Sequence, residues 1–271
     1  MAYTFGIELE FMGGTQARVV DALTRRGIVA QADRYSGDAS RGNAWLIKPD
    51  GSCEWEAVSP VLSLAQVMDQ APRVAQAIRD VGGNGADRAC GFHLHMAGFA
   101  HDVKAARNIV RRFINFEDTL DLIQPEDRRG NRNQYCQSNA RMFGDSPEEW
   151  TANIWDKAQR ADSLDALRNL FCPNGSRYFK VNLQSLTRHG TVEIRHHGGT
   201  LDGDTITAWA AFMDAFARTA EAQERLWKRP VGKVETQAER FRKMTRNVPA
   251  WAAKRLAIRA ARFNGGTNPF A

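Results

Sequence analysis

Apolar residues recur at every second position in several short stretches of the chain, and this alternation predicts β-strands. Residues 3–11 are rich in Phe, Ile and Tyr, and Gly13-Gly14 ends the predicted strand. Further strands are expected at 90–98, at 177–186 and 191–197 as a pair, and as short segments between turns within 28–62.

Apolar residues three and four positions apart predict helices in most of the remaining chain. The clearest is 101–123, in which Phe113 and Phe116 belong to one apolar face. Ser63 is placed to cap a helix that ends near Val81. The other predicted helices are 15–27, 146–171, 202–227 and 235–262.

Strands and helices alternate irregularly, and the connections between them are short. This order favours an α+β fold with an antiparallel sheet over a parallel βαβ stack. Neither GxGxxG nor GxxxxGK[ST] occurs in the sequence, so a Rossmann dinucleotide site and a P-loop are not expected.

The composition of the 271 residues, 43% apolar and 25% charged, is that of a soluble globular protein. No apolar run approaches the roughly 18 residues of a membrane span, and no signal-peptide pattern opens the sequence. The four cysteines stand far apart without a CxxC pair, which argues against a disulfide framework or a zinc knuckle. We therefore expect a cytoplasmic protein.

The net charge of +6 is concentrated towards the C-terminus. From Lys228 onward there are eleven basic residues and two acidic ones, whereas the first 227 residues have 26 basic and 29 acidic residues. We therefore expect a main domain at 1–227 and a basic helical extension at 228–271. The extension could contact nucleic acid or another polyanion, or it could be a solvated helix face.

Two acidic pairs occupy predicted strands near the N-terminus. Glu8 and Glu10 stand at alternate positions, so their side chains share one face of the strand, roughly 6–7 Å apart. Glu54 and Glu56 repeat this arrangement after a turn that carries Asp50. Like charges at this spacing repel unless a cation lies between them, and carboxylates bind Mg²⁺ in ATP sites. A shared metal site is one interpretation, and exposed strand edges are the other.

Two further pairs complete a set of four. His93 and His95 share one strand face, and HxH is a common metal-ligand pair that can also anchor a phosphate. Glu193 and Arg195 place a carboxylate beside a guanidinium, which suits phosphoryl transfer but also a plain cross-strand salt bridge. If all four pairs lined one cavity, several carboxylates would be buried together, and that arrangement is stable only with bound cations.

The four motifs, in this order, resemble those of the amidoligase family. That family belongs to the glutamine synthetase and glutamate–cysteine ligase group of carboxylate–amine ligases. The resemblance covers about residues 4–220. It rests on GIELEF at 6–11, DGS…E…SP within 50–60, GFHLHM at 91–96 and TVEIR at 191–195.

The resemblance implies a glutamine-synthetase-like fold, in which a curved antiparallel sheet lines the active site and helices pack on its outer face. It implies ATP with Mg²⁺ or Mn²⁺ as cofactors. The metal ligands carry over onto Glu8, Glu10, Glu56, His93 and Glu193, with Asp50 and Glu54 as additional ligands. Arg195 and His95 are the expected catalytic residues, and ATP is expected to contact Arg195, Lys48, Lys180 and Asn182.

The predicted function is therefore ATP-dependent formation of an amide, peptide-like bond through an acyl phosphate. The carboxylate and the amine would come from small molecules, peptides or proteins, without a membrane partner. The arginine-rich loop 125–145 is expected to hold an anionic substrate or to act as a lid. The alternatives are a zinc-dependent hydrolase that uses His93 and His95, and a nucleic-acid-binding protein that uses the basic extension.

Overall fold

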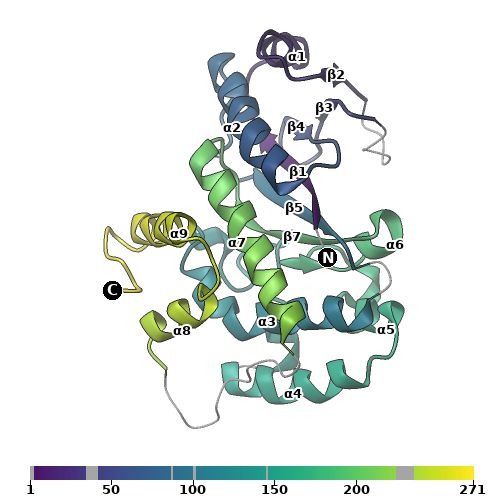
Figure 1. Cartoon of the computed structure of the whole chain (residues 1–271), viewed down its shortest axis with the longest axis vertical. Helices are drawn as coiled ribbons and strands as arrows, with labels where there is room; N and C mark the ends of the chain where they lie inside the picture. The colour runs from purple at the N-terminus through teal and green to yellow at the C-terminus, as the bar shows by residue number, and fades with distance from the viewer. Residues whose placement is uncertain (1–2, 35–41, 87, 100–101, 145, 224–234) are drawn as a thin grey trace. The chain divides into compact units, whose positions relative to one another are not determined.

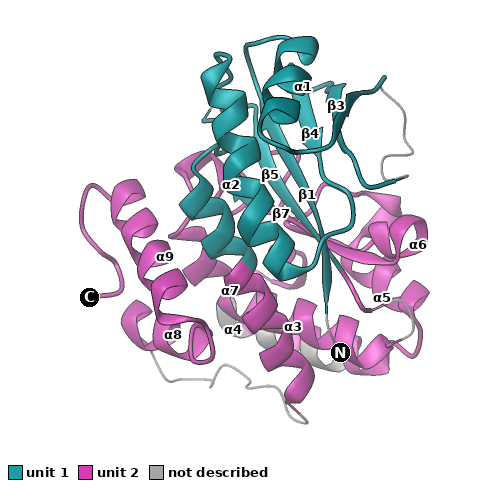
Figure 2. Cartoon of the chain, turned by 45° about the horizontal axis from the view of Figure 1, so that its top comes forward, with its two compact units in different colours: residues 1–96, 197–210 teal, residues 97–196, 211–271 magenta. Residues whose placement is uncertain are grey.

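The computed structural model describes residues 3–34, 42–86, 88–99, 102–144, 146–223 and 235–271. The chain divides into two units, shown in different colours in Figure 2. Unit 1 comprises residues 1–96 and 197–210, and unit 2 comprises residues 97–196 and 211–271.

Unit 1 contains a sheet with the strand order β2-β3-β4-β1-β5. The β1–β4 and β3–β4 pairs are antiparallel, as predicted, whereas β2 and β3 run parallel. Its strands are β1 (Thr4–Phe11), β2 (Ala30–Ala32), β3 (Trp45–Pro49), β4 (Trp55–Val58) and β5 (Gly91–Ala97). Its helices are α1 (Gln16–Arg25) and α2 (Leu64–Asp80).

The alternation of β1 separates an apolar face from an acidic face. Phe5, Ile7, Leu9 and Phe11 are all buried in the core of unit 1. Helices α1 and α2 lie beside each other next to the strands of this unit (Figure 1), and their own apolar residues are buried as well. Glu8 and Glu10 therefore point to the opposite face of β1, because side chains alternate along a strand.

Unit 2 is built around α3 (Val103–Asp121), which contacts α4, α5 and α8 (Figure 1). The other helices are α4 (Pro147–Arg160), α5 (Leu164–Phe171), α6 (Ser185–His189), α8 (Gln237–Met244) and α9 (Ala250–Phe263). Two antiparallel strands, β6 (Val181–Asn182) and β7 (Thr191–Gly198), complete it. The end of β7 and the first part of α7 (Gly203–Ala222) belong to unit 1.

Three predicted elements are interrupted in the structure. The predicted helix 146–171 is two helices, because Ser163 caps a new helix, α5, after the end of α4. The predicted strand 177–186 is reduced to β6, and a short helix, α6, follows it. The predicted helix 235–262 is divided into α8 and α9, and Pro249 is the residue that precedes α9.

The expected domain boundary at residue 227 lies outside the described residues, as do Lys228, Arg229 and Lys233. The helices after it belong to unit 2. Arg240 of α8 is fully buried and donates hydrogen bonds to Thr119 Oγ1 at 3.0 Å and to the Asn115 carbonyl at 2.5 Å. These contacts pack α8, part of the predicted helical extension, on α3.

The structure corrects one expectation about the cysteines. Cys53 and Cys90 form a disulfide within unit 1, with their Cα atoms 5.5 Å apart. They are 37 residues apart in the sequence, and their spacing contains no motif that would have indicated the pairing. Folding brings them together because Cys53 precedes β4 and Cys90 precedes β5, the two strands on either side of β1.

The α+β class is confirmed. None of the helices in the described ranges combines the length and the apolar character that crossing a bilayer requires.

Candidate active site

A row of three charged side chains crosses the sheet of unit 1. In the strand register, Glu10 of β1 is opposite Glu56 of β4, and Glu56 is opposite Lys48 of β3. Residues directly opposite one another present their side chains on the same face of a sheet. The Lys48 ammonium lies 2.9 Å from the Glu56 carboxylate, and both side chains are largely buried. This register places Glu56, rather than Glu54, beside Glu10.

Glu8 lies two residues before Glu10 and contacts both histidines of β5. Its carboxylate oxygens are 3.0 Å from His93 Nδ1 and 3.2 Å from His95 Nε2. His93 also approaches Glu10, with Nε2 at 3.7 Å from the carboxylate. The two predicted pairs, Glu8 with Glu10 and His93 with His95, therefore form one cluster on adjacent strands.

Gly91 allows the close approach of these groups. Its N–H donates a hydrogen bond to Glu10 Oε2 at 2.5 Å. A Cβ atom at this position would lie 2.7 Å from His93 Nε2 and 3.3 Å from the Glu10 carboxylate. A side chain here would displace the imidazole, so the glycine of the GFHLHM motif is required by packing around the cluster.

The segment before β4 contains two further predicted ligands, Asp50 and Glu54, and they make different contacts. Asp50 accepts hydrogen bonds from the Ser52 and Cys53 N–H groups, each at 2.8 Å, and one of its oxygens remains near Glu10 and Glu56. Glu54 is exposed and accepts the Gly13 N–H at 2.7 Å. Among the described residues Glu54 does not belong to a potential metal-ligand group, which argues against its expected role as an additional ligand.

Burial raises the pKa of each of these carboxyl groups, and neighbouring charges and hydrogen bonds strengthen or oppose that effect. Burial raises the pKa of Glu56 well above its usual range, the nearby Glu8 charge raises it further, and Lys48 opposes both. Burial also disfavours ionisation of Glu8, but His95 and His93 outweigh it and lower the pKa of Glu8 well below its usual range. For Asp50, burial is outweighed by the hydrogen bonds of its turn, chiefly that of Cys53, which lower its pKa.

The donor set fits a hard divalent cation. Ligand atoms of Glu8, Glu56 and His93 lie within 4.8 Å of one another, and so do those of Glu10, Asp50 and Glu56. Oxygen donors predominate, which suits Mg²⁺ or Mn²⁺ better than Zn²⁺. A bound cation would also place positive charge beside Glu56, whose pKa burial raises well above its usual range.

Unit 2 brings together three other predicted residues. Glu193 of β7 accepts hydrogen bonds from Asn182 Nδ2 and from Arg195 Nη1, both at 2.6 Å. Asn182 is opposite Glu193 in the β6–β7 pair, so the register itself creates this contact. The Gln184 N–H, 2.8 Å from Asn182 Oδ1, holds the amide in this orientation. Each Glu193 oxygen therefore has a polar partner.

Lys180 occupies a different environment from the one expected of an ATP-binding residue. It is fully buried, with its ammonium 2.9 Å from Glu117 and in a short ion pair with Asp121. His196 Nε2 lies 2.8 Å from the same Asp121 oxygen, and burial, followed by the Lys180 charge, lowers the pKa of His196 to about 4. This placement makes Lys180 part of the packing of unit 2 and argues against direct contact with ATP.

The two acidic residues of this buried group were missed in the sequence. Glu117 accepts the Ala140 N–H at 3.0 Å, and Asp121 accepts the Gly130 N–H at 2.8 Å, so both hold the loop that follows α3. The only local signal was their spacing of four residues, which places both carboxylates on one side of the helix. Their partner, Lys180, could not be recognised, because it lies 63 and 59 residues away.

Arginines of the loop 125–145 also contact other groups of the protein. Arg129 donates to the Gln124 and Phe263 carbonyls, both at 2.9 Å, and Arg132 pairs with Glu126. Arg128 is buried. Arg129 is therefore held by two backbone carbonyls, whereas the Arg132–Glu126 pair is exposed. Binding of an anionic substrate by this loop stays a prediction.

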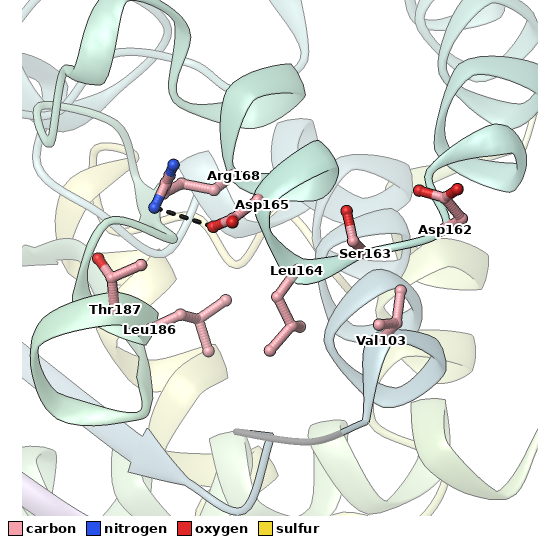
Figure 3. Close-up of a pocket in the computed structure, with 8 residues that line it drawn as sticks. All are labelled: Val103, Asp162, Ser163, Leu164, Asp165, Arg168, Leu186 and Thr187. Atoms are coloured by element: carbon pink, nitrogen blue, oxygen red, sulfur yellow. Dashed lines mark ion pairs between the residues drawn. The ribbon is translucent and has the colours of Figure 1, made fainter.

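A hollow of about 370 Å³ lies in unit 2, and none of its lining residues was predicted for the site (Figure 3). The side chains of Leu164 and Leu186 face each other across it, and Asp165 and Arg168 form an ion pair of 3.1 Å at its edge. Its remaining lining residues are Val103, Asp162, Ser163 and Thr187. It contains none of the ligand sets described above.

Comparison with known proteins identifies the family of the chain. The sequence model of the family described as "Putative amidoligase enzyme" matches residues 1–217, and the chain belongs to this family. Membership supports an enzyme that joins a carboxylate to an amine. No curated protein matches the chain.

A similar solved structure is the crystal structure of the complex between the prokaryotic ubiquitin-like protein Pup and its ligase PafA. The similarity has a TM-score of 0.48 with 12% sequence identity. It covers 98% of this chain and 65% of that chain, so this chain spans less than two thirds of the ligase.

Proposed function

We propose that this protein is an ATP-dependent carboxylate–amine ligase that activates its acid substrate as an acyl phosphate. The observation that supports this most strongly is the cluster of the half-buried Glu8 with the buried Glu10, Glu56 and His93 in a chain of the amidoligase family. A purely structural strand pair would not accumulate buried carboxylates with so few cations.

The residues of unit 1 would hold Mg²⁺ or Mn²⁺ through Glu8, Glu10, Glu56 and His93, with Asp50 as a further ligand. When bound, the metal would neutralise the phosphate oxygens and polarise the phosphoryl group. We assign Arg195 to the transferred phosphoryl group and Glu193 to a metal, in agreement with the motif that they share. Glu193 accepts a hydrogen bond from the Arg195 guanidinium and is itself held by Asn182, so the guanidinium is already oriented.

The reaction would proceed in two steps. The substrate carboxylate attacks the γ-phosphorus of ATP, and ADP leaves. The amine then attacks the acyl carbon, phosphate leaves, and the amine nitrogen loses a proton. We propose His95 as the base for that proton, because its imidazole is partly exposed and lies 3.2 Å from the Glu8 carboxylate.

Hydroxylamine allows this proposal to be tested before the amine substrate is identified. It traps acyl phosphates as hydroxamates, so the enzyme is incubated with ATP, Mg²⁺, hydroxylamine and a panel of single carboxylic acids and peptides. We expect equal amounts of ADP and hydroxamate with the correct acid. Folded, metal-loaded protein that produces neither with any acid, while it hydrolyses an ester or amide without ATP, would instead support the hydrolase alternative.

Lys48 provides a separate test of the cation site. Its ammonium lies 2.9 Å from the Glu56 carboxylate and would compete with a metal ion for it, so we expect Lys48→Met to tighten Mn²⁺ binding by about tenfold, equivalent to about 1.4 kcal/mol. Isothermal titration calorimetry measures this directly. Arg25→Met, at an exposed position of α1, removes the same charge and should leave the affinity unchanged. Unchanged Mn²⁺ binding with weakened ATP binding would show that Lys48 is a nucleotide ligand, as the sequence suggested.

A further inference from the structure

Residues 235–271, which follow the family match, are held against other parts of unit 2. In addition to the contacts of Arg240, Arg112 Nη2 donates to the Met244 carbonyl at 3.0 Å. Asn264 Nδ2 donates to the Leu122 carbonyl at 2.8 Å, beside the Arg129 bond to the Phe263 carbonyl. These contacts hold both ends of the α8–α9 segment against α3, so the outward side of α9 has a defined orientation within unit 2.

The outward side of α9 is apolar and basic. Trp251 and Ile258 are 47% and 50% exposed, although residues of these types are usually buried. They are seven residues apart, which is two helical turns or about 10.5 Å along one face. Lys254 and Arg262 are exposed on the same face, whereas Ala252, Leu256 and Ala260 point inward and are buried. We call the four outward residues the α9 face.

Exposed positive charge predominates in the segment 235–263, which contains α8 and α9. Arg242 and Arg246 of the preceding segment are also exposed. The two acidic residues of the segment have partners of their own. Glu235 is buried and forms an ion pair with Lys243, and Glu239 forms a capping box with Thr236 at the start of α8. The face therefore offers apolar contact area together with positive charge.

We propose that the α9 face binds an acidic amphipathic helix of a partner protein. Two apolar anchors two turns apart match the i and i+7 positions of such a helix, and Lys254 and Arg262 complement flanking Asp or Glu residues. The phosphates of a nucleic acid would pair with Lys254 and Arg262, but the Ile258 side chain would stay exposed to water. An anionic bilayer requires a broad apolar face, whereas this face has two apolar residues. Because α9 is already held against unit 2, α9 itself loses little conformational entropy when the partner helix binds.

The test uses the full-length protein and defined probes in fluorescence anisotropy. The first probe is a labelled helical peptide of Leu and Glu with Leu at i, i+3, i+4 and i+7. The second has the same composition with the leucines distributed around the helix. A single-stranded oligonucleotide and vesicles with anionic lipid are the competing ligands. We expect the first peptide to bind at least about tenfold more tightly than the second, because only it presents clustered anchors.

Two variants locate the contact. Trp251→Ala with Ile258→Ala should weaken binding of the first peptide by about tenfold or more, while Val61→Ala, at an exposed apolar position of unit 1, should not. Circular dichroism melting confirms that each variant is folded. Equal binding of the two peptides, tighter binding of the oligonucleotide or vesicles, or a dimer that the double substitution dissociates would each overturn the proposal.

Discussion

Replacing Glu56 by glutamine is expected to abolish metal-dependent ATP turnover and to weaken Mn²⁺ binding by about 100-fold or more. Loss of an outer partner of a metal ligand already costs about 10–100-fold in affinity, and a ligand itself should cost at least as much. Glu56 is central to the cluster, because it is opposite both Glu10 and Lys48 and belongs to both unit 1 ligand groups described above. Isothermal titration calorimetry with Mn²⁺ and an assay of ADP release measure the two effects.

Glu54→Gln is the matched control. It removes the same charge two residues earlier, at an exposed position, and its amide oxygen can still accept the Gly13 N–H. We expect nearly unchanged Mn²⁺ affinity and activity. If Glu54→Gln were the more damaging substitution, the register of the acidic strand would be shifted by two residues from the one in the structure.

Replacing Lys180 by methionine is expected to destabilise the protein by about 3–5 kcal/mol at neutral pH. The substitution leaves Glu117 and Asp121 buried without the ammonium that neutralises them. It should also loosen the loop after α3, because the same carboxylates hold the Ala140 and Gly130 N–H groups. Urea unfolding followed by circular dichroism measures the change in the free energy of unfolding.

Lys104→Met, at an exposed position of the same helix α3, should change stability by less than about 0.5 kcal/mol. Adding Asp121→Asn to Lys180→Met should restore part of the loss, because one uncompensated charge is then removed. A Lys180→Met protein that keeps its stability but binds ATP more weakly would reverse our interpretation and restore the nucleotide contact predicted from the sequence.

The secondary structure was predictable wherever a local signal was strong. The alternation of β1 and β5, the apolar face of α3 and the capping role of Ser63 are all present in the structure. Prediction was wrong where tertiary contacts overrode the pattern. Around β6, Asn139 exchanges two hydrogen bonds with the Val181 backbone, so a side chain from another segment occupies the strand edge and the predicted strand is short.

The candidate site was only partly predictable for the same reason. Glu8, Glu10, His93 and His95 could be assigned to strand faces from their spacing. Whether Glu54 or Glu56 faces them depends on which residue of β4 is opposite Glu10, and no local pattern encodes that register. Lys180 and Lys48 are both lysines near predicted strands, but one is buried against α3 and the other lies beside Glu56.

The sequence by itself determined the α+β class, the paired polar positions on each strand and the resemblance to amidoligases. These properties depend on alternation and on short motifs, which act over a few residues. The tertiary structure alone decided the Glu10–Glu56–Lys48 row, the Cys53–Cys90 bond and the attachment of the basic helices to α3. Each of these joins groups far apart in the chain, and their contact depends on strand register and helix packing.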